Sequence, residues 1–107
     1  MIYGGRRSSL RIEDKDHIHP RKLLEKAKVS PVKISNIGNI QLIDYISNRV
    51  LKGSTELRDW INGLDNKQEY INRHLIPEDE TLWTSDRFNG FLRARLRKIA
   101  DKIKSQL

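Results

Sequence analysis

The sequence predicts an α+β fold, in which two short strands in the first half of the chain are followed by a series of helices. Two short stretches, 9–18 and 40–43, have the apolar spacing of strands and lie next to turn-forming residues. From residue 54 onward, apolar residues recur at intervals of three and four, which indicates amphipathic helices. A chain of 107 residues has room for one compact domain, so we expect a single domain over 1–107.

The first strand is predicted within Ser9–Ile18, where Leu10 and Ile12 alternate with other residues. Pro20 closes this strand, because proline has no N–H to donate to a strand ladder. A short helix is then expected over Lys22–Lys28.

The second strand is predicted over Ile40–Ile43, directly after Asn36–Asn39, whose composition is typical of a turn. Asp44 is the expected N-cap of a helix that continues through Lys52. Gly53 would end that helix, since glycine readily adopts the backbone conformation that follows a helix C-terminus.

Three further helices are predicted from apolar spacing. One starts at Ser54, another spans Gln68–Leu75, and the longest follows Asp86, its expected N-cap. An apolar stripe along the longest helix is expected to pack against the core: Phe88, Phe91, Leu92, Leu96, Ile99, Ala100, Ile103 and Leu107. Its other faces are basic, and we interpret them as solvated, with direct DNA contact as the alternative: Arg87, Arg93, Arg95, Arg97, Lys98, Lys102 and Lys104. Trp60 and Trp83 are expected in the core.

The charge of the chain is uneven, although its net value is +7. Residues 1–35 hold nine basic and four acidic groups, and residues 85–107 hold seven and two, whereas residues 36–84 hold five and eight. This pattern is compatible with two basic chain ends that converge on one polyanion. The absence of cysteine excludes disulfides, cysteine-bearing zinc sites and thiol nucleophiles. We find neither an apolar run of membrane-spanning length nor a signal peptide, so we expect a soluble, cytoplasmic protein.

Polar residues with the chemistry of a hydrolase site surround the two predicted strands. Asp16 and His17 lie at the end of the first strand, Asn39 precedes the second, and Asn48 lies on the helix that follows. A neutral imidazole can take a proton from water near neutral pH. Carboxylate and amide oxygens suit Mg2+, which completes its shell with waters and substrate phosphate. The pattern therefore indicates a one-metal site for phosphodiester hydrolysis.

These residues belong to three segments: DHIHP (16–20), GNIQLI (38–43) and SNR (47–49). In this order and spacing the segments resemble the HNH nucleases, whose ββα-metal fold is a strand pair and a helix gripping one metal ion. HLIPEDETLW (74–83) and RFNGFLRARLRKIADKI (87–103) look like one subgroup, the C-terminal nuclease domain of GmrSD-type, modification-dependent restriction proteins. The resemblance implies an antiparallel ββα core over about 9–53, wrapped by helices over about 54–107.

The resemblance implies a role for each matching residue. His17 is the expected general base, and the Asn39 side chain is expected to brace the loop and orient the base by hydrogen bonding to backbone. Asp16 and Asn48 are the expected metal ligands. Basic residues expected to contact nucleic acid are Arg21, Lys22, Arg49 and Lys52. His19 stands where relatives commonly have an apolar or aromatic residue, and we expect it to pack within the fold.

Because adjacent side chains of a regular strand point to opposite faces, Asp16 and His17 can serve one site only if the strand ends or bends there. We expect Asp16, His17 and Asn48 to converge within metal-bridging distance.

The implied function is metal-dependent hydrolysis of DNA phosphodiester bonds, with Mg2+ as the expected ion and Mn2+ or another divalent ion as the alternative. The chain would be the nuclease module of a restriction or phage-defence system. A catalytically inactive HNH-like domain that binds nucleic acid or another protein is the rival interpretation. Nucleotide sensing is expected on an N-terminal domain or partner subunit outside these 107 residues. Double-strand cleavage by a one-metal site would favour a homodimer.

Overall fold

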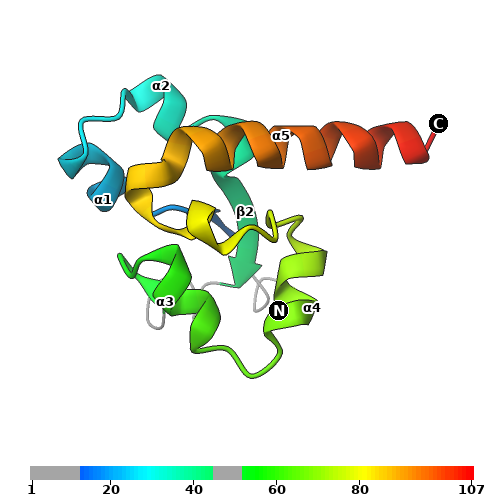
Figure 1. Ribbon diagram of the computed structural model, residues 1–107, viewed down its shortest axis with the longest axis horizontal. Coiled ribbons are helices and arrows are strands. Elements are labelled where there is room, and N and C mark those ends of the chain that lie inside the picture. The colour runs from blue at the N-terminus through cyan, green and yellow to red at the C-terminus, as the bar shows by residue number, and fades with distance from the viewer. Residues whose placement is uncertain (1–12, 45–51) are drawn as a thin grey trace, which may run out of the picture.

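A two-stranded antiparallel sheet connects the helical parts of the fold (Figure 1). The computed structural model describes residues 13–44 and 52–107. Its strands are β1 (Glu13–His17) and β2 (Ile40–Asp44), which confirms the predicted α+β class and the second strand. The first strand ends one residue before its predicted limit at Ile18.

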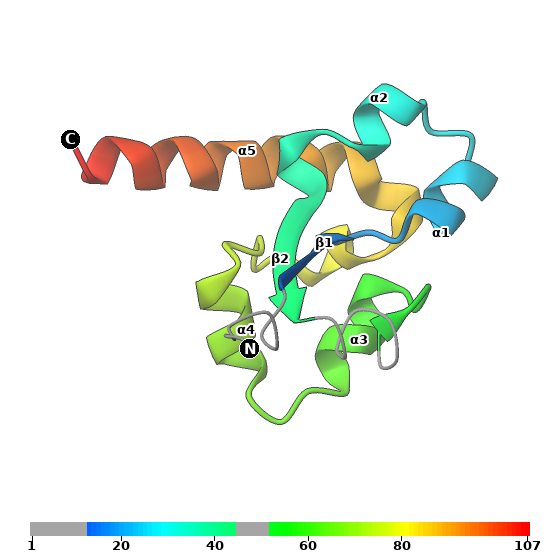
Figure 2. The ribbon, with the colours of Figure 1, turned by 180° about the vertical axis from the view of Figure 1, so that it is seen from behind.

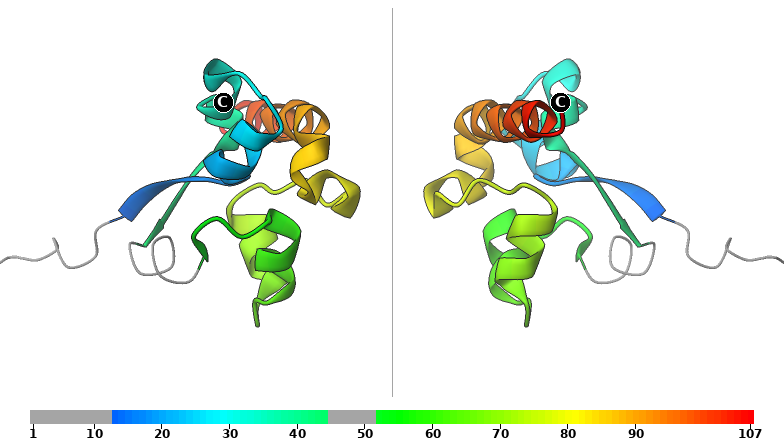
Figure 3. Two further views of the ribbon diagram at one scale, coloured as in Figure 1. Left: turned by 90° about the vertical axis from the view of Figure 1, so that its left-hand side faces the viewer. Right: turned by 90° about the vertical axis from the view of Figure 1, so that its right-hand side faces the viewer.

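The helices form two groups on either side of the strands (Figure 1; Figure 2). The first group is α5 (Phe88–Ser105), with α1 (Arg21–Lys26) and α2 (Pro31–Ile34) near its N-terminal end. The second is α3 (Leu57–Asn62) and α4 (Lys67–Arg73). Figure 3 shows that the end of β1 that leads into α1 lies near α5, whereas the opposite end of the strand pair points away from it.

In the described part of the chain, three short 3-10 helices connect these elements: η2 (Ile37–Asn39), η4 (Glu80–Trp83) and η5 (Ser85–Arg87). Neither α2 nor the last two 3-10 helices were predicted. The prediction that Asp86 caps α5 is wrong, because Asp86 lies inside η5 and α5 begins after Arg87 without a side-chain cap. The Arg87 N–H donates to the Thr84 carbonyl at 3.0 Å, which closes the turn that leads into α5.

Other helix ends differ from the predictions for identifiable reasons. The first helix stops at Lys26 because Lys28 has a φ of 63°, a left-handed conformation that a helix cannot continue through. Helix α3 begins at Leu57 and not at Ser54. Its N-cap residue, Glu56, instead accepts hydrogen bonds from the Ser85 N–H and hydroxyl and so joins α3 to η5.

The helix predicted from Asp44 to Lys52 falls largely on residues 45–51, which lie outside the described residues.

The hydrophobic core joins both helical groups. Trp83 is buried, as predicted, and its indole N–H donates to the Pro77 carbonyl at 2.8 Å. Trp60 is only partly buried and packs against the edge of the core. Full burial of an Ile, Leu or Phe side chain stabilises a fold by roughly 1.5–3 kcal/mol. The buried cluster comprises Ile18, Leu24, Ile34, Leu57, Ile61, Ile71, Ile76, Trp83, Phe88, Phe91 and Leu92.

Arg95 is buried, which corrects its predicted place on a solvated face of α5. Its guanidinium donates to the carbonyl oxygens of His74, Ile37 and Ile40, at 3.0, 3.2 and 2.9 Å. These bonds join α5 to the start of β2 and to the end of α4.

The apolar stripe of α5 is buried only in its N-terminal half. Ile103 is 56% exposed and Leu107 is 99% exposed. The C-terminal turns of the helix project beyond the rest of the fold (Figure 1), so the prediction that the whole stripe packs against the core is wrong.

His19 packs inside the fold, as predicted. Its ring meets Phe88 and Phe91 edge to face, and the ring Nε2 lies 2.9 Å from the Leu82 carbonyl oxygen. Because a carbonyl oxygen only accepts, Nε2 carries the proton of the neutral ring. Burial lowers the pKa of His19 from 6.5 to about 4.

Acidification is expected to destabilise the fold through His19. The unfolded chain binds this proton near pH 6.5 and the folded chain only near pH 4, so the free energy of unfolding falls as the pH drops through that interval. The loss due to His19 should approach roughly 3 kcal/mol. Urea denaturation between pH 7 and pH 4 should show a steeper loss for wild type than for His19→Gln, which keeps an N–H donor but cannot titrate. Equal losses in the two proteins would contradict this account.

Candidate active site

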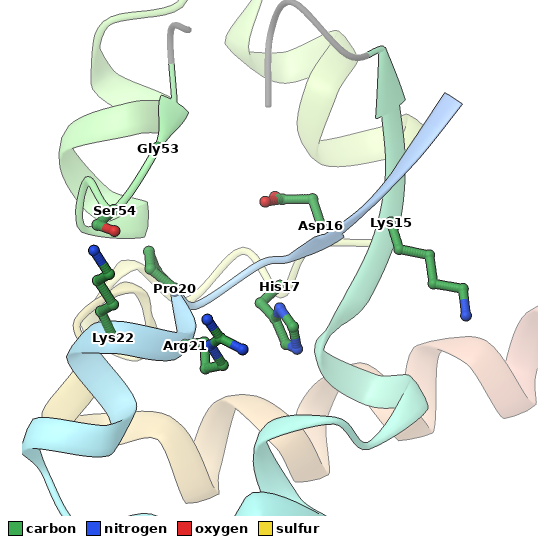
Figure 4. A pocket seen from close by; sticks show the side chains of 8 residues that line it. All are labelled: Lys15, Asp16, His17, Pro20, Arg21, Lys22, Gly53 and Ser54. Carbon is green, nitrogen blue, oxygen red and sulfur yellow. The ribbon is translucent and has the colours of Figure 1, made fainter. Parts of the chain in front are cut away.

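An open pocket of about 250 Å3 lies where β1 ends and α1 begins (Figure 4). It is lined by Lys15, Asp16, His17, Pro20, Arg21, Lys22, Gly53 and Ser54. Four of the residues predicted for the site therefore share one pocket: Asp16, His17, Arg21 and Lys22. The predicted ligand Asn48 and the basic residue Arg49 lie outside the described residues.

Asp16 is the carboxylate of this pocket, and it is almost buried, at 5% exposure. Its Oδ2 accepts a hydrogen bond from Gln41 Nε2 at 2.7 Å and lies 3.0 Å from the Lys52 ammonium. A neutral hydrogen-bond donor and a neighbouring positive charge thus compensate the burial of the carboxylate, as a buried anion requires.

Lys52 is buried, with an exposure of 1%, although a lysine side chain is almost never fully buried unless it is paired. Besides the Asp16 carboxylate, its Nζ donates to the carbonyl oxygens of His17 and Ile18 at 3.0 and 3.1 Å. An ammonium group has three donors, and these three oxygens use them all. Burial lowers the pKa of Lys52, and Asp16 opposes that decrease. The predicted contact of Lys52 with nucleic acid does not fit this placement.

His17 is the imidazole of the pocket, and its side chain is half-buried. Burial lowers the pKa of His17 below 6.5, although Asp16 partly opposes the shift, so the neutral ring predominates at pH 7. β1 runs regularly through His17, and the Asp16 and His17 side chains leave it on opposite sides (Figure 4). The strand ends directly after His17 and does not bend between the two residues.

Asn39 does not line the pocket and is fully buried. Its Oδ1 accepts from the His19 backbone N–H at 2.8 Å, and its Nδ2 donates to the carbonyl oxygens of His19 and Ile34 at 3.2 and 3.0 Å. The side chain therefore fixes the backbone of the segment that follows His17. It contacts residue 19 and not the His17 ring, so any effect on the imidazole passes through the backbone.

Arg21 and Lys22 lie on the rim of the pocket in the first turn of α1, and both are exposed. Arg21 also lies 3.8 Å from Glu25, but an exposed pair at this distance leaves the guanidinium available to other anions.

Two residues next to the pocket were missed by the sequence interpretation. Gln41 is buried opposite Asp16 in the strand ladder, and its Oε1 accepts from the Tyr70 hydroxyl at 2.7 Å. A polar residue within an otherwise apolar strand was the available signal for Gln41. Nothing local in α4 marks Tyr70.

The resemblance implies that the pocket holds a divalent ion. Within the described ranges, no three His, Cys, Asp or Glu side chains gather closely enough to enclose an ion. Asp16 offers a carboxylate, the ligand type that Mg2+ prefers, and Mg2+ keeps several waters in place of protein ligands. The Oδ2 atom of that carboxylate is already paired with the Lys52 ammonium at 3.0 Å, so the described residues offer a divalent ion a single, partly neutralised carboxylate.

Comparisons of this chain with protein-family models, curated proteins and solved structures gave no match. In the part of the chain that the structure describes, no helix combines the length and apolar character needed to cross a membrane.

Replacement of Asn39 by alanine is expected to lower the free energy of unfolding by roughly 2–4 kcal/mol, since it leaves buried backbone groups without partners. Urea denaturation measures this change directly. Asn89→Ala is the matched control, because Asn89 is exposed and its one side-chain hydrogen bond among the described residues is the 3.4 Å contact with Lys33. The control should stay within about 0.5 kcal/mol of wild type. An equally small effect of Asn39→Ala would show that the brace is dispensable.

Proposed function

We propose that this chain is a metal-dependent endonuclease domain of the HNH class that hydrolyses DNA phosphodiester bonds. The observation that carries the proposal is the composition of one pocket. A neutral imidazole and a carboxylate lie there with exposed cationic side chains at the rim. Hydrolysis of a phosphodiester needs a base, charge stabilisation and a means of holding phosphate, and these groups supply that chemistry.

His17 is the proposed general base. Its ring is neutral at pH 7, so a ring nitrogen can accept a proton from water while the water oxygen forms a bond to phosphorus. The bond from phosphorus to the 3′-oxygen breaks, and the 3′-oxygen leaves with the electron pair. Asn39 holds the backbone beyond His17 and so limits how far the imidazole can move.

Arg21 and Lys22 are the proposed phosphate contacts. Both side chains are exposed on the pocket rim, in the first turn of the short helix α1. Their charges therefore face solvent. Contacts to phosphate provide affinity without reading the bases, so we expect little sequence preference from this domain.

Asp16 is the proposed ligand of a divalent ion, with Asn48 as a second ligand outside the described residues. When bound, such an ion stabilises the negative charge that develops on the phosphate and the leaving oxygen. By its resemblance to restriction nucleases, the domain would act in phage defence, with nucleotide or modification sensing on another domain or subunit.

A second candidate function is nucleic-acid binding without cleavage. The Lys52–Asp16 pair favours this alternative, because a buried ammonium 3.0 Å from the carboxylate opposes binding of another cation there. The Asp16 and His17 side chains also leave β1 on opposite sides, which favours the same alternative.

The His17→Ala variant should lose at least about 100-fold of the rate of supercoiled plasmid nicking with Mg2+ or Mn2+, because it lacks the proton acceptor. Binding of a labelled DNA duplex, measured by fluorescence anisotropy, should change little. Added imidazole should restore part of the nicking activity of His17→Ala. It should restore no nicking activity to protein treated with EDTA.

A His17→Ala variant that nicks at the wild-type rate would remove His17 from the mechanism. A wild-type protein that binds DNA in a salt-dependent manner but shows no EDTA-sensitive nicking would support the non-catalytic alternative instead.

A further inference from the structure

Exposed charges are segregated between the two helical groups of the fold. In the first group, nine exposed residues on α1, α2, their connection and α5 are cationic, whereas two, Glu25 and Asp101, are acidic. The cationic residues are Arg21, Lys22, Lys26, Lys28, Lys33, Arg93, Arg97, Lys102 and Lys104. Residues 54–86, which include α3 and α4, carry seven exposed acidic residues and three exposed basic ones. Within the described residues, a polyanion is therefore attracted to the first group and repelled by the second.

Three of the cationic side chains form a row on the side of α5 that faces away from the core. Arg97 follows Arg93 by four residues and Lys104 follows Arg97 by seven, so all three lie on one face of the helix. Arg95 is buried and lies two residues from Arg93, which places it on nearly the opposite side of the helix. We call Arg93, Arg97 and Lys104 the outer row of α5, and at about 1.5 Å per residue the row is about 17 Å long.

The outer row has no acidic partner in the described part of the chain. Its three residues are exposed, and the ion pairs among the described residues involve other side chains. Asn89, one turn before Arg93, accepts a hydrogen bond from the Lys33 ammonium of α2 at 3.4 Å. Lys33 therefore extends the row at the N-terminal end of α5. Helix α1, which carries Arg21 and Lys22, lies near the same end (Figure 1; Figure 2).

Unpaired cations along a fixed helix suit the phosphate backbone of a nucleic acid. The N-terminal half of α5 is anchored by the buried Phe88 and Phe91 and by three hydrogen bonds of Arg95, so the row is held rigidly. Contact with phosphate releases counterions and needs no apolar side chains. A membrane-surface helix, by contrast, inserts a broad apolar face that commonly carries aromatic side chains. Both aromatic side chains of α5 are in the core, and the large apolar residues that it exposes are Ile103 and Leu107.

We infer that the outer row of α5 binds the phosphate backbone of duplex DNA, outside the pocket and its rim. This inference rests on the proposed function only in taking DNA as the ligand, and it requires no metal ion. Because the contacts are made to phosphates, the row contributes affinity without reading the bases. Repulsion by the acidic residues of 54–86 favours approach of the duplex to the side that carries α5.

Fluorescence anisotropy of a short labelled DNA duplex, with the full chain in EDTA at several NaCl concentrations, tests this inference without cleavage. In the triple variant Arg93→Gln, Arg97→Gln and Lys104→Gln, we expect the Kd to rise by about 10-fold or more. The slope of log Kd against log salt concentration should fall by about 3, because each lost phosphate contact lowers it by about 1. A duplex of different sequence should show the same changes.

The matched control neutralises three exposed cations of the second helical group: Arg58→Gln, Lys67→Gln and Arg73→Gln. It changes the net charge equally, but Arg58 and Arg73 lie 3.4 and 3.6 Å from the carboxylates of Asp59 and Glu69. Its Kd should stay within about 2-fold of wild type, because charges more than about 10 Å from the duplex are largely screened at about 0.1 M salt. Circular dichroism establishes that each variant is folded.

Three results would overturn the inference. Equal losses of affinity in the two triple variants would show that net charge alone matters. An unchanged Kd and salt slope in the outer-row variant would show that the row does not contact DNA. Binding of wild type to phosphatidylserine vesicles through the outer row, without binding to the duplex, would assign the row to a membrane surface. These measurements contain EDTA, so their failure is separate from a failure of the proposed hydrolysis, which is measured by nicking with Mg2+ or Mn2+.

Discussion

The buried Asp16 carboxylate is the constraint around which the described part of the site is arranged. A carboxylate at this depth needs compensating donors, and the fold supplies Gln41 from the neighbouring strand and Lys52 from the segment before α3. Lys52 in turn holds the carbonyls of His17 and Ile18, so the same interaction fixes the backbone at the end of β1. The charge of the carboxylate therefore determines both its own surroundings and the backbone that carries the imidazole.

The rest of the structure supports this end of the sheet from both sides. Arg95 joins α5 to the carbonyls that flank the start of β2, and Asn39 joins that start to the backbone of His19. On the far side, Tyr70 reaches Gln41 from α4. Arg95 and Tyr70 donate to carbonyl and amide oxygens, and Asn39 both accepts from and donates to the backbone of His19. The rim residues of the pocket, Arg21 and Lys22, are exposed by contrast.

Local patterns in the sequence were sufficient for the fold class, the second strand and the approximate places of α3, α4 and α5. They were also sufficient to group Asp16 and His17 with Arg21 and Lys22, because these residues are close in the chain and so share a pocket. The places of Arg95 and Lys52 could not be predicted, since a long basic side chain is buried only where distant segments bring carbonyl or carboxylate oxygens together. For the same reason Tyr70 was missed: its partner lies on another element, and α4 itself shows only an ordinary amphipathic pattern.

We propose that the pocket at the end of β1 binds one divalent ion next to His17. A crystal of the full chain grown with a DNA duplex and soaked in Mn2+ would locate that ion by its anomalous scattering. We expect a single strong peak in the pocket, against the Asp16 carboxylate and a phosphate of the duplex. A duplex bound at Arg21 and Lys22 without an anomalous peak in the pocket would contradict the proposed hydrolysis. It would support a domain that binds nucleic acid without cleaving it.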